Sequence, residues 1–128
     1  MKRRAFIFSA LIVTVTIPLV KYTLWDKWYN NPLLVPKELS RFCDDNILRK
    51  MGNRYLQIFP EENNKTKLND ILLTDYDGKK INSTDEFLIL KSLNKKIYLE
   101  FSANQIIILN GWVISKTEAR QCALFFLS

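Results

Sequence analysis

Residues 1–22 constrain this chain more than any other stretch, because they place a cluster of positive charge directly before an apolar run. Lys2, Arg3 and Arg4 precede the run 5–20, which is interrupted only by hydroxyl side chains and Pro18. As a helix this run would be about 24 Å long, which is short for a bilayer span of roughly 20 residues. A basic cluster before a short apolar segment is typical of an export signal. We therefore predict that residues 1–22 are an export signal or membrane anchor.

The pair Arg3–Arg4, followed after one position by Phe6, resembles the twin-arginine export signal. That route is used by proteins that fold, or bind a folded partner, before they cross the membrane. The alternative is an ordinary signal or anchor that happens to contain two arginines. No small-residue cleavage site follows the apolar run, and Lys21 with the aromatic residues after it is typical of a membrane interface. We therefore expect an uncleaved N-terminal anchor.

The rest of the chain is long enough for one small domain. Residues 23–36 contain two prolines and are predicted to be a juxtamembrane linker, and residues 37–128 are predicted to be the domain. The whole chain has a net charge of +6, but four basic residues belong to the leader, which leaves 15 basic and 13 acidic residues. No basic stripe remains, so we expect no binding to nucleic acid.

The chain contains no histidine. A Ser-His-Asp or Cys-His catalytic pair and a histidine-ligated zinc or haem are therefore excluded within it. We identify no catalytic, cofactor-binding or metal-binding residue in the sequence.

The pattern of apolar residues predicts a mainly α domain with one β-hairpin near the C-terminus. Asn110-Gly111 between two β-rich runs indicates a hairpin with strands at 106–109 and 112–114. The string STDE at 83–86 and the string SKTE at 115–118 are typical of capping boxes that open helices. The helices are expected, in chain order, over residues 36–43, 44–59, 67–76, 83–103 and 115–127.

Two features of these predicted helices bear on packing. Gly52 either weakens the second helix by about 1 kcal/mol relative to Ala or permits another helix to approach closely. The inward stripe of the fourth helix is predicted to consist of Phe87, Leu90, Leu93 or Asn94, Ile97 and Phe101.

Five residues stand out as candidates for special roles. Cys43 and Cys122 lie in two predicted helices, and in an exported protein they either form a disulfide or are two small buried residues that do not meet. Trp112 follows the tight turn and is either an interface anchor or a core residue. Glu118 is explained by the capping box. No local feature explains Arg120, which we expect to contact a partner or an internal acid.

Three strings together resemble a group of small bacterial proteins with twin-arginine leaders: NGWVISKTEARQCAL (110–124), RRAFI (3–7) and ILRKMGNRYLQ (47–57). This group is similar to the small subunits of membrane-bound, FAD-dependent sugar and alcohol dehydrogenases, of the gluconate 2-dehydrogenase small-subunit type. The string that begins at Gly111 is the most specific piece. The chain departs from the group in its Ile- and Val-rich apolar run and in its missing cleavage site.

The resemblance implies a non-catalytic accessory subunit that binds, stabilises and escorts a large flavoprotein of the glucose–methanol–choline oxidoreductase class. FAD is expected in that partner and not in this chain, and a cytochrome c subunit often accepts the electrons. Arg3, Arg4 and Phe6 would direct export, and Trp112, with Glu118 and Arg120, would lie in or near the partner contact. The expected location is the periplasmic side of the bacterial inner membrane. The alternative is an independent membrane-anchored envelope domain that interacts with some other protein.

Overall fold

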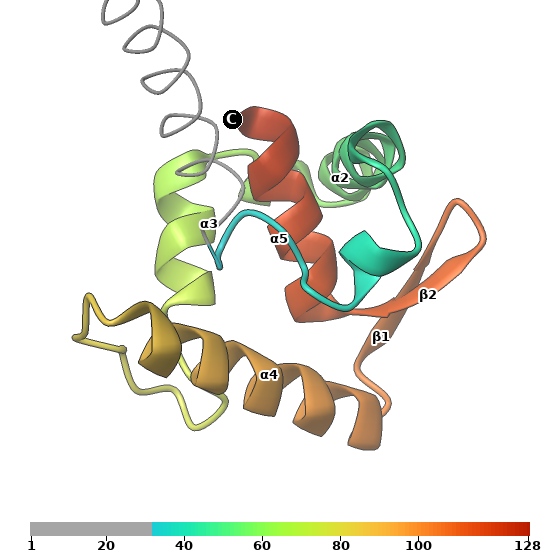
Figure 1. Cartoon of the computed structure of the whole chain (residues 1–128). Helices are drawn as coiled ribbons and strands as arrows, with labels where there is room; N and C mark the ends of the chain where they lie inside the picture. The colour runs from blue at the N-terminus through green and yellow to red at the C-terminus, as the bar shows by residue number, and fades with distance from the viewer. Residues whose placement is uncertain (1–31) are drawn as a thin grey trace, which may run out of the picture. The chain divides into compact units, whose positions relative to one another are not determined.

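The computed structural model of the protein describes residues 32–128. The predicted export signal, with Arg3, Arg4 and Phe6, lies outside the described residues. The expected fold class of the domain is confirmed: it is mainly helical, with a two-stranded hairpin near the C-terminus (Figure 1). The elements are η1 (Leu39–Arg41), α2 (Asp45–Ile58), η2 (Pro60–Glu62), α3 (Lys65–Leu72), α4 (Glu86–Ser102), β1 (Ile106–Leu109), β2 (Trp112–Ser115) and α5 (Lys116–Leu127).

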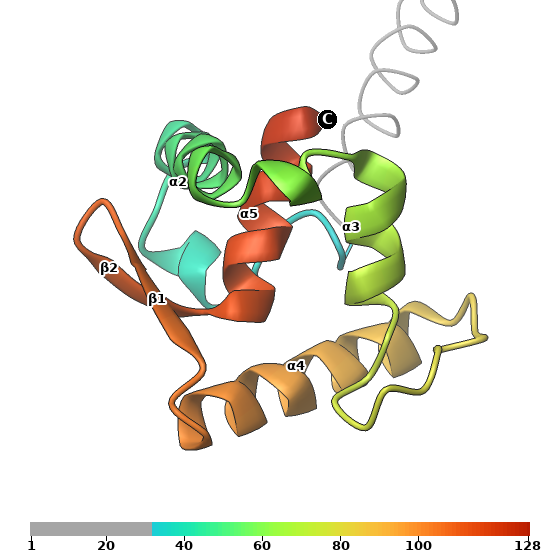
Figure 2. The same ribbon diagram turned by 180° about the vertical axis from the view of Figure 1, so that it is seen from behind.

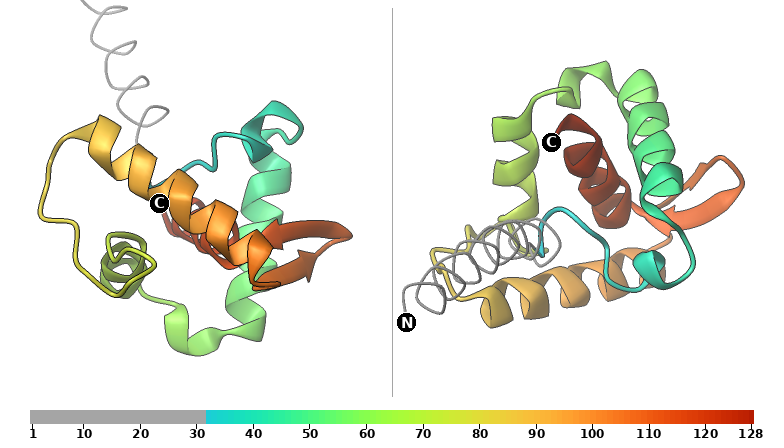
Figure 3. Two further views of the ribbon diagram at one scale, coloured as in Figure 1. Left: turned by 90° about the horizontal axis from the view of Figure 1, so that it is seen from below. Right: turned by 45° about the horizontal axis from the view of Figure 1, so that its top comes forward.

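The last helix, α5, is the centre of the domain. It is enclosed by α2, α3 and α4 (Figures 1 and 3), and 8 of its 12 residues are buried. A helix that is covered on most sides is stable only when its neighbours are in place. The core around it includes Leu48, Met51, Tyr55, Leu68, Leu72, Leu93, Leu109, Ile114 and Cys122.

Gly52 is the point at which α2 packs directly against the backbone of α5. A Cβ atom at this position would overlap the carbonyl group of Cys122 and would lie 2.9 Å from the backbone nitrogen of Ala123. Of the two roles expected for Gly52, the structure shows the close helix approach. Arg49 adds a polar contact between the same helices, because its guanidinium donates to the carbonyl of Phe125 at 3.2 Å.

The entry of the chain into the domain differs from expectation. The helix predicted over 36–43 is reduced to the 3-10 turn η1. Leu34 and Pro36, which were expected in the linker, are buried. The side chain of Gln121 donates to the carbonyl of Pro32 at 2.8 Å. Residues 32–36 therefore pack as part of the domain.

The third and fourth helices begin at caps that differ from the predicted ones. Helix α3 starts earlier than expected, because the Asn64 side chain accepts from the backbone of Thr66 and Lys67. The capping box predicted at 83–86 is wrong. Asp85 is the N-cap of α4 and accepts from the Phe87 N–H at 3.0 Å, while the Ser83 hydroxyl accepts from the Asp85 N–H. Asp and Ser are equally good N-caps. Because Asp85 takes this role, the helix starts two residues later than predicted.

The hairpin and the start of α5 follow the prediction closely. Asn110 and Gly111 have φ angles of 51° and 86°, as a two-residue turn with φ above zero at both positions requires. The strands are antiparallel, and Ile108 lies opposite Val113 while Leu109 lies opposite Trp112. The capping box over 115–118 is present with both of its hydrogen bonds. Figure 2 shows from behind that the hairpin projects from the helical body.

Among the helices of residues 32–128, none has the length and apolar character needed to cross a membrane.

Candidate interaction surfaces

The buried face of α4 is not the stripe that the sequence predicted. Phe87 is 70% exposed and Phe101 is 45% exposed, so the prediction was wrong at both ends of the helix. Leu93 is buried and Asn94 is exposed, which resolves the alternative between them. Two charged residues, Lys96 and Glu100, occupy the buried face instead. The inner face of α4 is therefore held by polar contacts as well as by apolar packing.

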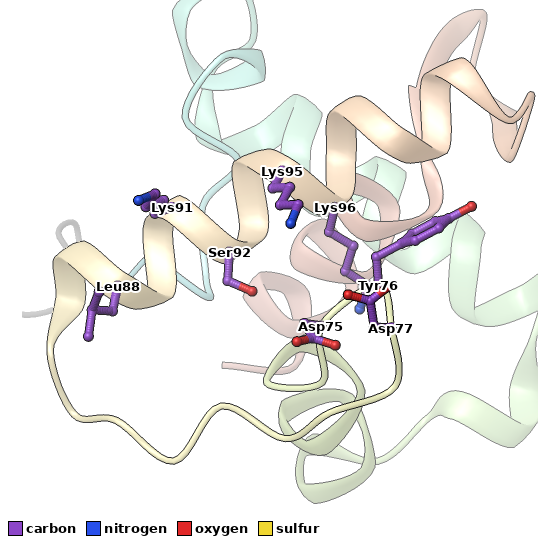
Figure 4. Close-up of a pocket in the computed structure, with 8 residues that line it drawn as sticks. All are labelled: Asp75, Tyr76, Asp77, Leu88, Lys91, Ser92, Lys95 and Lys96. Atoms are coloured by element: carbon purple, nitrogen blue, oxygen red, sulfur yellow. The ribbon is translucent and has the colours of Figure 1, made fainter.

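Lys96 attaches α4 to the C-terminal end of α3. Its ammonium group donates to the carbonyls of Ile71 and Thr74, both at 2.9 Å. A cation is favourable beside the unpaired carbonyls at the end of a helix. Burial lowers the pKa of Lys96, while nearby Glu100 opposes that shift. In Figure 4 the side chain of Lys96 runs inward past the 75–77 loop, whereas Lys91 points away from it.

Glu100 attaches α4 to the start of α5 in the complementary way. Its carboxylate accepts from the backbone N–H of Thr117 at 3.0 Å, in the first turn of α5. A negative charge is favourable at this end of a helix. The two buried charges of α4 therefore lie against helix ends of opposite polarity, which fixes the rotation of α4 about its axis.

This rotation leaves several large apolar side chains of α4 in solvent. Phe87, Leu88, Tyr98 and Phe101 are 70%, 46%, 71% and 45% exposed. Together with exposed lysines they recur every three or four residues and share one side of the helix. We call this surface the α4 outer face, and it consists of Phe87, Leu88, Lys91, Asn94, Lys95, Tyr98 and Phe101. Large exposed apolar side chains gathered on one side of a helix indicate an interaction site.

Two shallow cavities flank α4. One, of about 230 Å³, lies between the 75–77 loop and the helix and is lined by Lys91, Ser92 and Lys95 on the helix side (Figure 4). The other, of about 330 Å³, lies between Lys37–Glu38 and the Tyr98–Phe101 end of α4.

The hairpin offers a second exposed apolar surface. Ile108 and Val113 lie opposite each other and are 66% and 53% exposed. Trp112 pairs with the buried Leu109 beside the turn and is still 37% exposed. Its ring therefore combines features of both expected alternatives, because it lies on the core-facing side of the hairpin but remains accessible. We call the exposed residues of the hairpin, Ile108 and Val113 on its outer face and Trp112 on its other face beside the turn, the hairpin surface.

Arg120 contacts an internal acid, one of the two alternatives expected for it. Its Nε donates to the Glu62 carboxylate at 2.8 Å, and the Tyr55 hydroxyl donates to the same carboxylate at 2.9 Å. The three groups link α2, η2 and α5. Burial raises the pKa of Tyr55 well above its usual range. Burial opposes the charge on Arg120, but the hydrogen bond to Glu62 raises the pKa of Arg120 overall.

Glu118 is also engaged inside the domain. It is buried, accepts from the Ser115 N–H at 3.1 Å and is part of the capping box. Burial raises the pKa of Glu118, while the hydrogen bonds from Ser115 oppose the shift. Of the three residues expected at a partner contact, Glu118 thus caps α5 where it follows β2, Arg120 joins α5 to η2, and Trp112 reaches the surface.

Cys43 and Cys122 are free thiols, and both belong to the same apolar core. Cys43 is 5% exposed and Cys122 is completely buried. Burial raises the pKa of both thiols, and at Cys122 the neighbouring Glu118 and Cys43 raise it further. In the folded domain both side chains act as small apolar groups with little thiolate character.

Glu62, Lys96 and Glu100 were not singled out by the sequence. Each acts on a segment far away along the chain: Arg120 is 58 residues from Glu62, and Thr117 is 17 residues from Glu100. The sequence indicated the roles of Lys96 and Glu100 only weakly, because a lysine and a glutamate four residues apart on a helix are usually a solvent-exposed pair.

Within residues 32–128, no group of three or more Cys, Asp or Glu side chains is placed to hold a metal ion. No known protein family, curated protein or solved structure to which we compared the chain matches it.

Proposed function

We propose that this protein is a non-catalytic accessory subunit that binds, stabilises and escorts a large FAD-dependent dehydrogenase of the glucose–methanol–choline class. The observation that carries the proposal is the hairpin surface, where Ile108, Trp112 and Val113 are exposed on a projecting element. Trp is enriched among the residues that dominate binding energy. A two-stranded hairpin is marginal by itself, so exposed apolar groups on it favour a protein partner.

The buried ionisable groups support binding rather than catalysis. A general acid or base has to lie within hydrogen-bond reach of its substrate. Lys96, Glu100 and Glu118 instead contact backbone groups of this chain. Glu62 and Arg120 contact each other. Each of these groups therefore has a role in the fold that accounts for its position.

The string that carries the family resemblance also has a structural account consistent with the proposal. It begins in the hairpin turn and continues into α5. Within it, Trp112 belongs to the hairpin surface, Ser115 and Glu118 cap α5, and Arg120 binds Glu62. We infer that Trp112 contacts the flavoprotein, while Glu118 holds the junction of β2 with α5 and Arg120 anchors α5 to η2.

Escort of a folded flavoprotein also explains why a twin-arginine signal would be present at Arg3 and Arg4. FAD is inserted in the cytoplasm, so the partner crosses the membrane folded. The location we propose is the periplasmic side of the inner membrane, where a cytochrome c subunit is a possible third component. This chain itself needs no cofactor for such a role.

The test is an affinity purification of the full-length protein from its native membrane, followed by a flavin absorbance scan of the eluate. We expect a yellow complex that contains a large flavoprotein. Ile108→Lys should abolish co-purification of the flavoprotein, because a charge would be buried in the contact. Tyr76→Lys is the matched control, because Tyr76 is also a large apolar side chain, 42% exposed, and lies in the loop before α4 and not in the hairpin.

A colourless eluate from the unaltered protein would contradict the proposal. It would favour the alternative, an independent membrane-anchored envelope domain that binds some other protein. The same exposed hairpin surface would then be the first place to look for that partner.

A further inference from the structure

We propose that the α4 outer face lies on an anionic membrane surface, so that phospholipid headgroups cover it. This surface is separate from the hairpin surface and does not require the flavoprotein. The proposal therefore adds a second attachment to the membrane, beyond the N-terminal segment.

The arrangement of side chains on α4 is that of a helix lying in a membrane interface. Phe87 and Leu88 occupy one end of the exposed side, Lys91 and Lys95 the middle, and Tyr98 with Phe101 the other end. Helices that lie in the interface combine large apolar side chains with lysines, whose long stems keep the ammonium group near the headgroups. At about 1.5 Å per residue, the surface from Phe87 to Phe101 is roughly 21 Å long.

The charges of this surface complement anionic lipid. The ammonium groups of Lys91 and Lys95 form no ion pair or hydrogen bond with any other residue in the described part of the chain. Glu100 is buried on the opposite side of α4, which leaves Glu86 at the start of the helix as its exposed acid. The aspartates of the 75–77 loop line the far side of the cavity beside Lys91 and Lys95 (Figure 4).

The position of the apolar run 5–20 favours a membrane, rather than a second protein, as the surface that covers the α4 outer face. Residues 21–31 separate that run from the described domain. Even a fully extended segment of this length spans at most about 40 Å. If residues 5–20 stay in the membrane, as the sequence predicts, the bilayer surface is always within reach of the domain. A weak contact of α4 with lipid then becomes effectively intramolecular and is strongly favoured.

The test uses the full-length protein reconstituted into vesicles and a fluorescent label at the centre of the α4 outer face. Asn94→Cys provides the labelling site, and the native thiols do not compete because both are buried. The label is a polarity-sensitive fluorophore, and a lipid-attached quencher reports its proximity to the bilayer. Asn53→Cys on the exposed side of α2 is the matched control.

In vesicles of equal parts phosphatidylglycerol and phosphatidylcholine, the emission at position 94 should shift to the blue and be quenched. In pure phosphatidylcholine both effects should be much smaller, because the anchor is present but the charge attraction is absent. Lys91→Glu with Lys95→Glu should remove both effects in the anionic vesicles. Lys50→Glu with Lys65→Glu, which changes the net charge equally at exposed positions elsewhere, should retain them.

Equal signals at positions 94 and 53, or a signal at 94 that does not depend on anionic lipid, would overturn the proposal. A signal at 94 that appears only when the flavoprotein is added would also overturn it, because the α4 outer face would then be a protein interface. The vesicle comparisons are made without the flavoprotein, so their failure is distinguishable from failure of the flavoprotein to co-purify.

Discussion

Replacing Arg120 by methionine should destabilise the domain by about 3 kcal/mol. The substitution keeps the length and apolar stem of the side chain but removes the cation that faces Glu62 at 2.8 Å. The two side chains are 19% and 10% exposed, so Glu62 would be left nearly buried without its counter-ion. Removing one partner of a buried pair costs about 3–5 kcal/mol. The lower end applies because Tyr55 still donates to the same carboxylate.

The expected readout is a fall of roughly 12–24 °C in Tm, since 1 kcal/mol corresponds to about 4–8 °C for a domain of this size. Thermal unfolding of the full chain in detergent, followed by circular dichroism, measures it.

Two comparisons make this reasoning refutable. Adding Glu62→Gln to Arg120→Met should restore much of the lost stability, because no charge is then buried alone. Arg41→Met is the matched control, because its pair with Glu38 is exposed and such pairs contribute little. If Arg120→Met is no more destabilising than Arg41→Met, the pair does not have the role assigned to it.

Three further predictions follow from the core. Gly52→Ala should lower stability by about 2 kcal/mol or more, because overlap with the α5 backbone outweighs the gain of about 1 kcal/mol in helix propensity; a higher Tm would contradict the close approach. Glu118→Gln keeps the capping oxygen and should be at least as stable at pH 7. Because burial raises the pKa of Glu118 in the folded state, its charge opposes folding above that pKa. The unaltered protein should therefore gain stability as the pH falls through it, and the variant should lack that gain. Cys43 and Cys122 should react with a thiol reagent only after unfolding in urea, and labelling of either in the folded protein would refute their burial.

The difference between expectation and structure is clearest in α4. Its apolar residues recur at helical spacing on more than one side, so periodicity alone selected a stripe that included Phe87 and Phe101. The contacts of Lys96 and Glu100 with the ends of α3 and α5 decided which side turned inward. Those contacts join groups up to 25 residues apart, and no local pattern reveals them.

The start of α4 shows a smaller version of the same difference. Ser83 and Asp85 are both good N-caps and lie two residues apart, so the sequence alone did not separate them. Arg120 is a third case, because the sequence left open whether it contacts a partner or an internal acid and did not indicate Glu62. The sequence left open whether Cys43 and Cys122 form a disulfide or are two buried thiols, and in the structure they are free thiols in one core.

The sequence by itself determined the features that depend on a few neighbouring residues. The turn at Asn110-Gly111, the capping box at Ser115–Glu118 and the helical class of the domain follow from backbone dihedrals and short-range hydrogen bonds. Only the tertiary structure decided which groups were buried, because burial depends on which distant segment covers each side chain. The tertiary packing therefore determined that Arg120 pairs with Glu62 and that the α4 outer face and the hairpin surface stay exposed.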